Sequence, residues 1–391
     1  MKTPTSKAAK RILLSVPHMG GRELEYVKEA FATNWLCSTY GPHLATLEER
    51  FSALIGLPSV ALGNGTEALH LGLKLLGIKT GDEVLTPTLT FAASCNPVLF
   101  EHGVPVFIDS ERASWNLDPE LLAGFLKKRA RVNRLPKIVT VVHLFGQSAD
   151  IDPIVEICGR YELPLLEDAA EALGTRYKGR LLGGFGQVGI YSFNGNKIIS
   201  ATSGGMLVSP NKEWVDKARY WSTQARDPDP TGVNNYYHSE LGYNYRQSNV
   251  LAGIALGQLE VLDQRVAERR AVAFRYRDGF ADLAGIELMP QAPYGLHTNW
   301  LSCFLIDPAK FGLTRDELIH FLNAANVESR PVWRPMHLQK LYEGYERVGG
   351  EVAEDLNRRG ICLPSSSSLS LEDQRFVIER VREAHHLSSV N

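Results

Sequence analysis

The chain has 391 residues, of which 44% are hydrophobic and 22% charged, and its formal net charge is −2. This composition is ordinary for a globular protein, and the length predicts a large domain of about 200 to 250 residues with a smaller one beside it. The near-zero charge gives no reason to expect nucleic acid or a membrane surface as a partner.

The cysteines and the N-terminus exclude other classes. The five cysteines are odd in number, widely scattered and without C-x-x-C spacing: Cys37, Cys95, Cys158, Cys303 and Cys362. This pattern argues against a disulfide framework and a zinc site, so no metal is expected, and Cys95 is interpreted as a buried, inert thiol. The apolar run at residues 12–16 is too short for a signal peptide or a membrane span, which predicts a cytoplasmic protein.

The first elements lead to a possible phosphate site. Two helices are predicted from apolar residues at helical spacing, at residues 21–34 and 44–54. A strand at Ser59–Leu62 is followed by Gly63-Asn64-Gly65-Thr66 and a helix at 67–76. A glycine-rich turn that opens a helix presents free N–H groups and the positive end of the helix dipole, which suits a phosphate. The same turn is also ordinary helix-entry chemistry with Thr66 as the N-cap.

A parallel sheet is predicted next. Strands at 84–86 and 104–108 precede a β-branched run at 138–142 that is typical of a buried parallel strand. A helix at 152–161 then leads to another strand, which gives a βαβ unit that delivers several polar strand ends to one edge. Phe91 follows the first of these strands, where it could stack on a planar ring or belong to the core.

Asp168 and Lys197 form the central pair of the sequence. Leu163–Leu166 predicts a buried strand that ends in Glu167-Asp168, and ligands of open α/β sheets lie at the carboxyl ends of strands. Lys197 comes 29 positions later, in a turn between strands expected at 190–193 and 204–208. Most lysines are surface charges, but this pair suits pyridoxal phosphate, which is carried as a Schiff base on a lysine and kept protonated at its ring nitrogen by a carboxylate. Lys197 would then also move the proton.

A competing cofactor motif is set aside. Residues 184–189 read GFGQVG, which formally matches the G-x-G-x-x-G dinucleotide fingerprint of a nicotinamide-dependent reductase. That fingerprint needs a following helix and an acidic residue about 20 positions on, whereas here a strand follows and the acidic residue is missing. We interpret these glycines as turn residues.

The last part of the chain predicts a second domain. Helices are expected at 214–226 and within 242–263, followed by a strand at 299–306 and helices at 315–323 and 371–384. The pattern changes to shorter elements beyond Arg270. We therefore place the large domain, with an N-terminal arm, at residues 1–265 and the small C-terminal domain at 266–391.

Several motifs in order resemble a known family. They are Gly65-Thr66, TPTLTFAAS (86–94), HLFGQSADID (143–152), EDAAEALG (167–174), SFNGNKI (192–198) and GYNYRQSNV (242–250). Over nearly the whole chain they resemble the sugar aminotransferases of the DegT/DnrJ/EryC1/StrS type. SFNGNKI, STQARD (222–227) and RPVWRPMHLQ (330–339) are most similar to the branch that acts on UDP-linked 4-keto-6-deoxy-N-acetylhexosamines in bacillosamine-type pathways.

The resemblance implies a fold and a site. The fold would be α/β, of the fold-type I (aspartate aminotransferase-like) class, with a large mixed-sheet domain and a smaller C-terminal α/β domain. The resemblance implies that Lys197 forms the Schiff base, that Asp168 pairs with the pyridine nitrogen, that Glu171 lies beside the phenolic oxygen and that Phe91 stacks on the ring. Gly65, Thr66 and Ser192 would bind the cofactor phosphate, and Asn244 would contact the phosphate in the site of the neighbouring subunit. Trp333 and His337 would contact the sugar nucleotide. The Asn244 contact implies a homodimer with shared sites.

The implied reaction is a ping-pong transfer of the amino group of L-glutamate to a nucleotide-linked keto-sugar. Some relatives carry histidine in place of the lysine and perform dehydration, so the presence of Lys197 favours transamination. A dTDP- or GDP-linked sugar or a keto-inositol stays open as the acceptor. A cofactor-binding regulator without turnover is the alternative from another class of protein.

Overall fold

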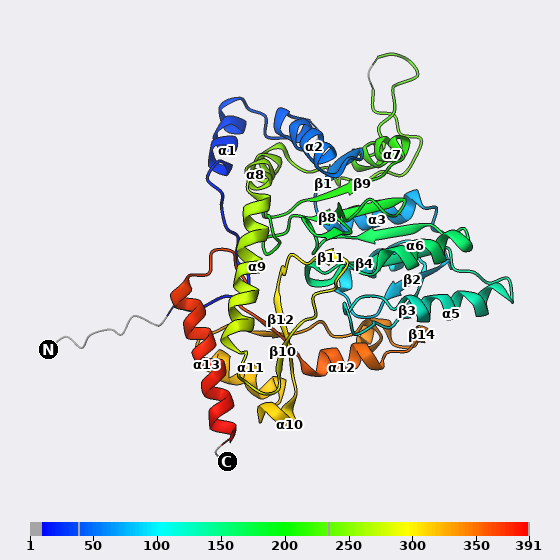
Figure 1. Ribbon diagram of the computed structural model, residues 1–391. Helices are drawn as coiled ribbons and strands as arrows, with labels where there is room; N and C mark the ends of the chain where they lie inside the picture. Colours follow the sequence, from blue (N-terminus) through cyan, green and yellow to red (C-terminus); the bar gives the residue numbers. More distant parts are fainter. Residues whose placement is uncertain (1–9, 38–39, 234, 390–391) are drawn as a thin grey trace.

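The computed structural model describes residues 10–37, 40–233 and 235–389. Its largest element is an eight-stranded mixed sheet, on the right in Figure 1. In spatial order its strands are β1 (Ser59–Leu62), β9 (Gly205–Val208), β8 (Val188–Ser192), β5 (Leu165–Asp168), β4 (Ile138–Val142), β2 (Glu83–Pro87), β3 (Val104–Ile108) and β14 (Arg347–Val348). In this spatial order the six strands β8, β5, β4, β2, β3 and β14 run parallel to one another. Strand β9 is antiparallel to both of its neighbours, β1 and β8.

Two smaller sheets hold the other strands of the described residues. One has the antiparallel order β10 (Ile286–Leu288), β12 (Ser302–Ile306), β15 (Gly360–Leu363) and β13 (Arg330–Pro331). The other joins β11 (Gly295–Leu296), β6 (Arg176–Tyr177) and β7 (Arg180–Leu181).

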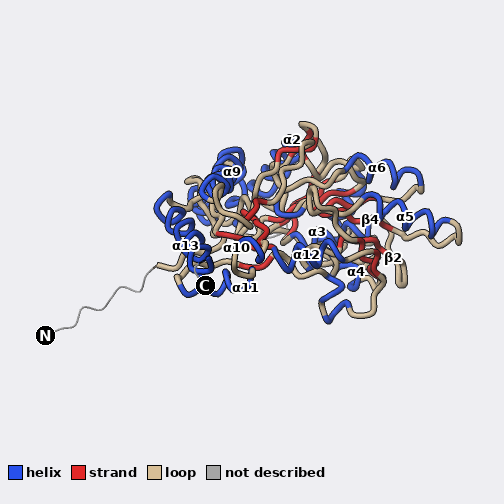
Figure 2. The backbone as a smooth tube through the Cα atoms, turned by 60° about the horizontal axis from the view of Figure 1, so that its bottom comes forward, coloured by secondary structure: helices blue, strands red, loops and turns tan. Residues whose placement is uncertain are grey.

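Helices cover these sheets. They are α1 (Glu23–Ala32), α2 (Pro42–Ile55), α3 (Gly65–Leu75), α4 (Asn96–Phe100), α5 (Pro119–Ala130), α6 (Ile151–Arg160), α7 (Lys212–Ser222), α8 (Asn249–Leu259), α9 (Leu262–Gly279), α10 (Pro308–Phe311), α11 (Arg315–Ala324), α12 (Glu351–Arg359) and α13 (Leu371–Ser389). Figures 1 and 2 place α9 and α13 at one end of the molecule and α5 and α6 at the other. Within the described ranges, no helix is long and apolar enough to cross a membrane. The cellular location stays a prediction.

The central parallel strands β4 and β5 are buried over their whole length. All five residues of β4 are buried, as expected for a strand with helices on both faces of its sheet. The predicted strand at 138–142 is confirmed, as are those at 59–62 and 104–108. The mixed α/β architecture that the sequence predicted is likewise confirmed.

Some predicted helix limits were wrong. The N-cap of α3 is Asn64 rather than Thr66, because the Asn64 side chain accepts a hydrogen bond from the Glu67 N–H at 2.9 Å. The helix predicted within 242–263 is two helices. Ser248 caps the start of α8 by accepting the Leu251 N–H, and the helix is interrupted between Leu259, where α8 ends, and Leu262, where α9 begins. The helix predicted at 214–226 is α7, which ends at Ser222.

The boundary predicted at residue 265 falls inside α9. Two segments also cross the predicted division. Ile12 pairs with Val327 and packs in the hydrophobic cluster beside β12, while β14 comes from the C-terminal part of the chain and pairs with β3 of the large sheet. The division at residue 265 therefore stays a proposal, and these two segments would tie the proposed domains together.

Candidate active site

Parallel strand ends meet at one edge of the large sheet. Asp168 ends β5 and Ser192 ends the neighbouring parallel strand β8. A cavity of about 280 Å³ lies at this edge. Eight of the ten predicted site residues line it: Gly65, Thr66, Phe91, Asp168, Glu171, Ser192, Lys197 and Trp333.

Lys197 lies between a carboxylate and an aromatic ring. Its Nζ is 3.7 Å from Glu171 Oε1 and 4.0 Å from the centroid of the Trp300 ring, and 13% of its side chain is exposed. Burial lowers the pKa of the Lys197 amine, while the charges of Glu171 and Asp168 act in the opposite direction. A larger fraction of this amine is therefore unprotonated, and able to react as a nucleophile, than of an exposed lysine at the same pH.

Asp168 is held on both oxygens. Ser94 Oγ donates to its Oδ2 at 2.6 Å, the Ala170 N–H donates to its Oδ1 at 3.0 Å, and Ser94 is itself 2.8 Å from Thr90 Oγ1. Burial raises the pKa of Asp168, and the hydrogen bond from Ser94 is the largest of the opposing effects. The carboxylate therefore has a fixed orientation at the strand end, which suits a permanent partner for a cationic group.

Glu171 faces the same cavity from the loop that follows β5. Its Oε2 accepts the Phe145 N–H at 2.8 Å, and burial raises its pKa. Phe145 has a φ of 54°, in the left-handed region that bulky residues rarely adopt. The unusual backbone of Phe145 is compatible with a hydrogen bond that fixes Glu171 beside Lys197.

The start of α3 forms the opposite wall. Helix N-termini attract anions because their first N–H groups lack helical partners. Gly65, the first residue of α3, lies so close to β8 that an added Cβ would be 3.0 Å from Ser192 Cβ. Glycine at this position therefore keeps space between the helix N-terminus and Ser192.

The cavity has an aromatic side. Phe91 is 54% exposed and lies 5.4 Å from the Trp333 ring, which is 5.7 Å from the Phe145 ring. The alternative interpretation of Phe91 as a core residue was therefore wrong. Cys95, by contrast, is buried, and burial raises the pKa of its thiol.

Two predicted residues lie outside this cavity. Asn244 is exposed and pairs through its backbone with Thr223. The His337 ring is bound instead by Thr88 Oγ1 at 2.6 Å and by Glu354 Oε1 at 3.0 Å.

Four residues that shape the cavity were not predicted: Thr90, Ser94, Phe145 and Trp300. Thr90 and Ser94 lie in the TPTLTFAAS motif, where two hydroxyl groups four positions apart next to Phe91 were a usable signal. Phe145 lies in the HLFGQSADID motif, but its left-handed backbone has no signature in the sequence. Trp300 is 103 positions beyond Lys197, so nothing local indicates their contact.

The glycine-rich segment 183–189 forms a turn that leads into β8 and is not a dinucleotide-binding site. The N–H groups of Gly183, Phe185 and Gly186 all donate to the buried carboxylate of Glu167. A strand, β8, follows them. This arrangement supports their interpretation as turn residues.

The sheet, the lysine and the carboxylate at the strand ends together define the class of fold-type I, pyridoxal phosphate-dependent aminotransferases. The model of the DegT/DnrJ/EryC1/StrS aminotransferase family matches residues 17–382, and the chain belongs to this family. The enzyme is an aminotransferase whose cofactor is pyridoxal phosphate, as the sequence predicted.

Individual relatives agree with this assignment. EpsN of Bacillus subtilis strain 168, whose name assigns it provisionally to the pyridoxal phosphate-dependent aminotransferases, is 45% identical over 97% of both chains. A GDP-perosamine synthase of Caulobacter vibrioides is 36% identical over 94% of this chain and 96% of its own. Among solved structures, the aminotransferase TlmJ from Streptoalloteichus hindustanus superimposes with a TM-score of 0.87 at 28% identity, covering 98% of this chain and all of that one.

The residues of the cavity fit the cofactor chemically. Pyridoxal phosphate has an aldehyde, a basic ring nitrogen, a planar ring and a phosphate, and the cavity offers an amine, a carboxylate, an aromatic side and a helix N-terminus. Asn196 also lines the cavity, and its Oδ1 is buried without a hydrogen-bond partner among the described residues. A buried polar atom of this kind is expected to find its partner in a bound group.

Proposed function

We propose that the enzyme transfers the amino group of L-glutamate to the keto carbon of a nucleotide-linked 4-keto-6-deoxy sugar, with UDP-2-acetamido-2,6-dideoxy-hexos-4-ulose as the acceptor. The observation that carries the transamination step is the position of Lys197 Nζ, which faces the cavity 3.7 Å from Glu171 and shares that cavity with Asp168. A sugar acceptor is supported by the similarity to the GDP-perosamine synthases, and the UDP-linked acetamido sugar by the resemblance of SFNGNKI, STQARD and RPVWRPMHLQ to that branch of the family.

The proposed roles follow from the positions of the side chains. When bound, pyridoxal phosphate would supply an electron sink for the carbon that loses its proton. Lys197 Nζ, as a free amine, would take that proton as the general base and give it back as the general acid. Asp168 would balance positive charge at the ring nitrogen, Phe91 would cover the ring, and Gly65, Thr66 and Ser192 would hold the phosphate.

The surface outside the cavity supports a charged, extended acceptor. A second cleft of about 430 Å³ adjoins the cavity, because Thr90, Phe91 and Trp333 line both. Arg315, Arg330 and Arg334 line this cleft. Guanidinium groups suit phosphate oxygens, which favours an acceptor that carries a diphosphate over a neutral keto-inositol.

GDP-linked sugars are the second candidate, because three GDP-perosamine synthases are 33–36% identical to this chain. The test offers L-glutamate with UDP-, GDP- and dTDP-linked 4-keto-6-deoxy sugars and measures 2-oxoglutarate and amino-sugar in equal amounts. Preference for the UDP-linked acetamido sugar is expected. Turnover with the GDP-linked sugar alone would replace the proposed acceptor, and turnover with none of them would contradict the proposed acceptor class.

Gly65→Ala should weaken cofactor binding by about 10-fold. The added Cβ would lie 3.0 Å from Ser192 Cβ and narrow the proposed phosphate site. The dissociation constant of pyridoxal phosphate, measured by fluorescence titration of the cofactor-free protein, checks this. Gly124→Ala in α5 is the control, since an added Cβ there has nothing within 4 Å, and unchanged affinity in both variants would argue against the phosphate site.

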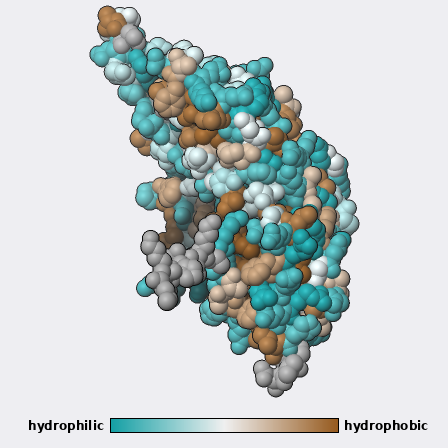
Figure 3. All heavy atoms as spheres, turned by 90° about the vertical axis from the view of Figure 1, so that its left-hand side faces the viewer, coloured by the Kyte–Doolittle hydropathy of each residue, from teal (hydrophilic) through white to brown (hydrophobic). Residues whose placement is uncertain are grey.

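We further propose a homodimer with shared sites, in which Asn244 serves the neighbouring subunit. Asn244 is exposed, and the flanking Tyr243 and Tyr245 rings pack against His70 of α3, which leaves the Asn244 side chain available to another chain. Exposed apolar residues are found nearby in the chain, at Val233, Tyr236 and Leu241. Figure 3 shows brown hydrophobic patches between hydrophilic ones on the face it views.

Mixing two impaired variants tests this arrangement. Lys197→Ala and Asn244→Ala subunits, unfolded and refolded together in equal amounts, should form mixed dimers with one intact site each. About a quarter of the wild-type activity should then return, because half of the dimers are mixed and each of these has one working site of two. Activity no higher than the mean of the two parent variants would show that Asn244 acts within its own subunit or not at all.

A further inference from the structure

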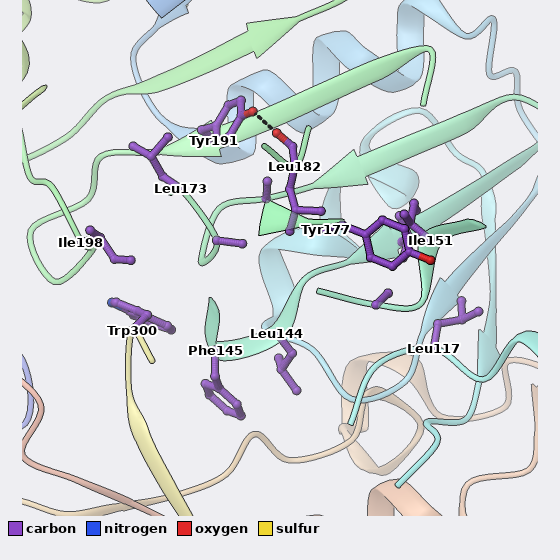
Figure 4. Close-up of a cluster of buried hydrophobic side chains, with 14 of the residues drawn as sticks. Leu117, Leu144, Phe145, Ile151, Leu173, Tyr177, Leu182, Tyr191, Ile198 and Trp300 are labelled. Atoms are coloured by element: carbon purple, nitrogen blue, oxygen red, sulfur yellow. Dashed lines mark hydrogen bonds between the residues drawn. The ribbon is translucent and has the colours of Figure 1, made fainter. Parts of the chain in front are cut away.

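Trp300 approaches Lys197 from a different part of the fold. It lies just before β12 of the four-stranded sheet, which begins at Ser302, yet it lines the cavity at the edge of the large sheet. Only 1% of its surface is exposed. Figure 4 shows its indole ring between the segment that carries Ile198 and the ring of Phe145, and the Trp300 and Phe145 rings are stacked at 6.4 Å with an interplanar angle of 21°.

The indole contacts the lysine segment in two ways. Lys197 Nζ lies 4.0 Å from the ring centroid, within the range of a cation–π contact. Trp300 Nε1 donates to the carbonyl oxygen of Asn196 at 2.6 Å, which fixes the backbone immediately before Lys197. One side chain thus holds both the amine and the peptide unit that precedes it.

Arg269 fixes the tryptophan relative to the lysine. Its Nη1 donates to the Trp300 carbonyl at 2.6 Å and its Nη2 to the Lys197 carbonyl at 3.3 Å. The same Nη2 is 3.1 Å from Ser15 Oγ, which also donates to Asn196 O at 2.8 Å. The Arg269 side chain is only 1% exposed, so the hydrogen bonds that connect Trp300 with the backbone around Lys197 are buried.

We propose that Trp300 is a positioning residue for the proton transfer, holding the free Lys197 amine against its ring face whenever that amine is not joined to the cofactor. The inference rests on the proposed function. A ring face stabilises an ammonium group without accepting a proton, because the indole offers no lone pair toward it. The ring therefore keeps the Lys197 amine near the reacting carbon and takes no proton from it.

Other charges face the same amine and must be separated from the effect of the ring. Glu171 and Asp168 raise the pKa of Lys197, whereas Arg269 and burial lower it. A substitution that removed the tryptophan would also change burial. The test therefore alters the ring electronically and leaves its shape and its N–H group in place.

The experiment replaces Trp300, at this site only, by mono-, di- and trifluorotryptophan. Fluorine withdraws electron density from the ring face and weakens its attraction for a cation. The pKa of Lys197 is measured by ¹³C NMR of protein labelled at the lysine ε-carbon, with and without pyridoxamine phosphate, and the signal is assigned by its loss in Lys197→Ala. The same series at Trp115, another buried tryptophan with 1% exposure that is outside the cavity lining, is the control.

The pKa of Lys197 should fall stepwise by about one unit across the Trp300 series, because the protonated form loses its favourable ring contact. The Trp115 series should leave it unchanged. An identical pKa throughout the Trp300 series would overturn the inference even if glutamate still converts the cofactor. Failure of glutamate to convert the cofactor in the wild type would instead refute the proposed function, while the titration without cofactor would still decide the ring contact.

Discussion

Lys197→Ala is expected to lower the rate of amino transfer by roughly 10³-fold or more, because it removes both the covalent attachment of the cofactor and the group that moves the proton. Lys197 Nζ lies among Glu171, Asp168 and Trp300, and general acid–base catalysis needs a group within reach of the reacting atom. The rate at which L-glutamate converts the cofactor, followed by visible absorbance in a stopped-flow instrument, measures the loss directly.

Lys212→Ala is the matched control. Lys212 is an exposed lysine that pairs with Asp216 one helical turn away, so its removal should leave the rate unchanged. A Lys197→Ala enzyme that converts its cofactor within 10-fold of the wild-type rate would show that another base moves the proton.

Asp168→Asn should slow the same half-reaction by roughly 10²- to 10³-fold while the cofactor stays attached to Lys197. The amide cannot balance a positive charge at the ring nitrogen, so the ring withdraws electrons less strongly. The fold should tolerate the change, because asparagine has the same shape and Ser94 Oγ can turn from donor to acceptor toward the new NH₂ group. Visible absorbance measures attachment, and the glutamate half-reaction measures the loss of rate.

Asp109 offers the contrasting substitution. It is also a buried aspartate at a strand end, but its carboxylate accepts the N–H groups of Gly350, Val352 and Ala353 at the start of α12. Asp109→Asn should therefore lower the melting temperature and leave the half-reaction of the folded enzyme intact. An Asp168→Asn enzyme with the wild-type rate would show that this carboxylate is structural as well.

The sequence predicted the sheet better than the helix limits. Buried parallel strands such as Ile138–Val142 carry a local signal, since both faces must be apolar. The limits of α8 depended on which polar residue caps it. The loop of tyrosines, Tyr243 and Tyr245, was expected to precede the helix, and it does, but the sequence did not show that the helix itself is interrupted before Leu262.

The residues of the site likewise include some that the sequence could predict and some that it could not. Asp168 and Lys197 were predictable because Asp168 ends one strand and Lys197 follows its neighbour, and neighbouring parallel strands end at one edge. Trp300 was not, because its contact with Lys197 depends on how a separate sheet packs against the first. Arg269 likewise resembles any arginine of a helix until its bonds to three carbonyl oxygens are seen: Trp300, Ser365 and Lys197.

The attachment of the cofactor to Lys197 is the central claim, and borohydride reduction followed by peptide mass spectrometry tests it most directly. Reduction makes the bond between the cofactor and its lysine permanent. The peptide that contains Lys197 should carry the mass of the reduced pyridoxyl phosphate group, and prior addition of L-glutamate should abolish the label. A label on a different lysine, or none after incubation with pyridoxal phosphate, would contradict the account.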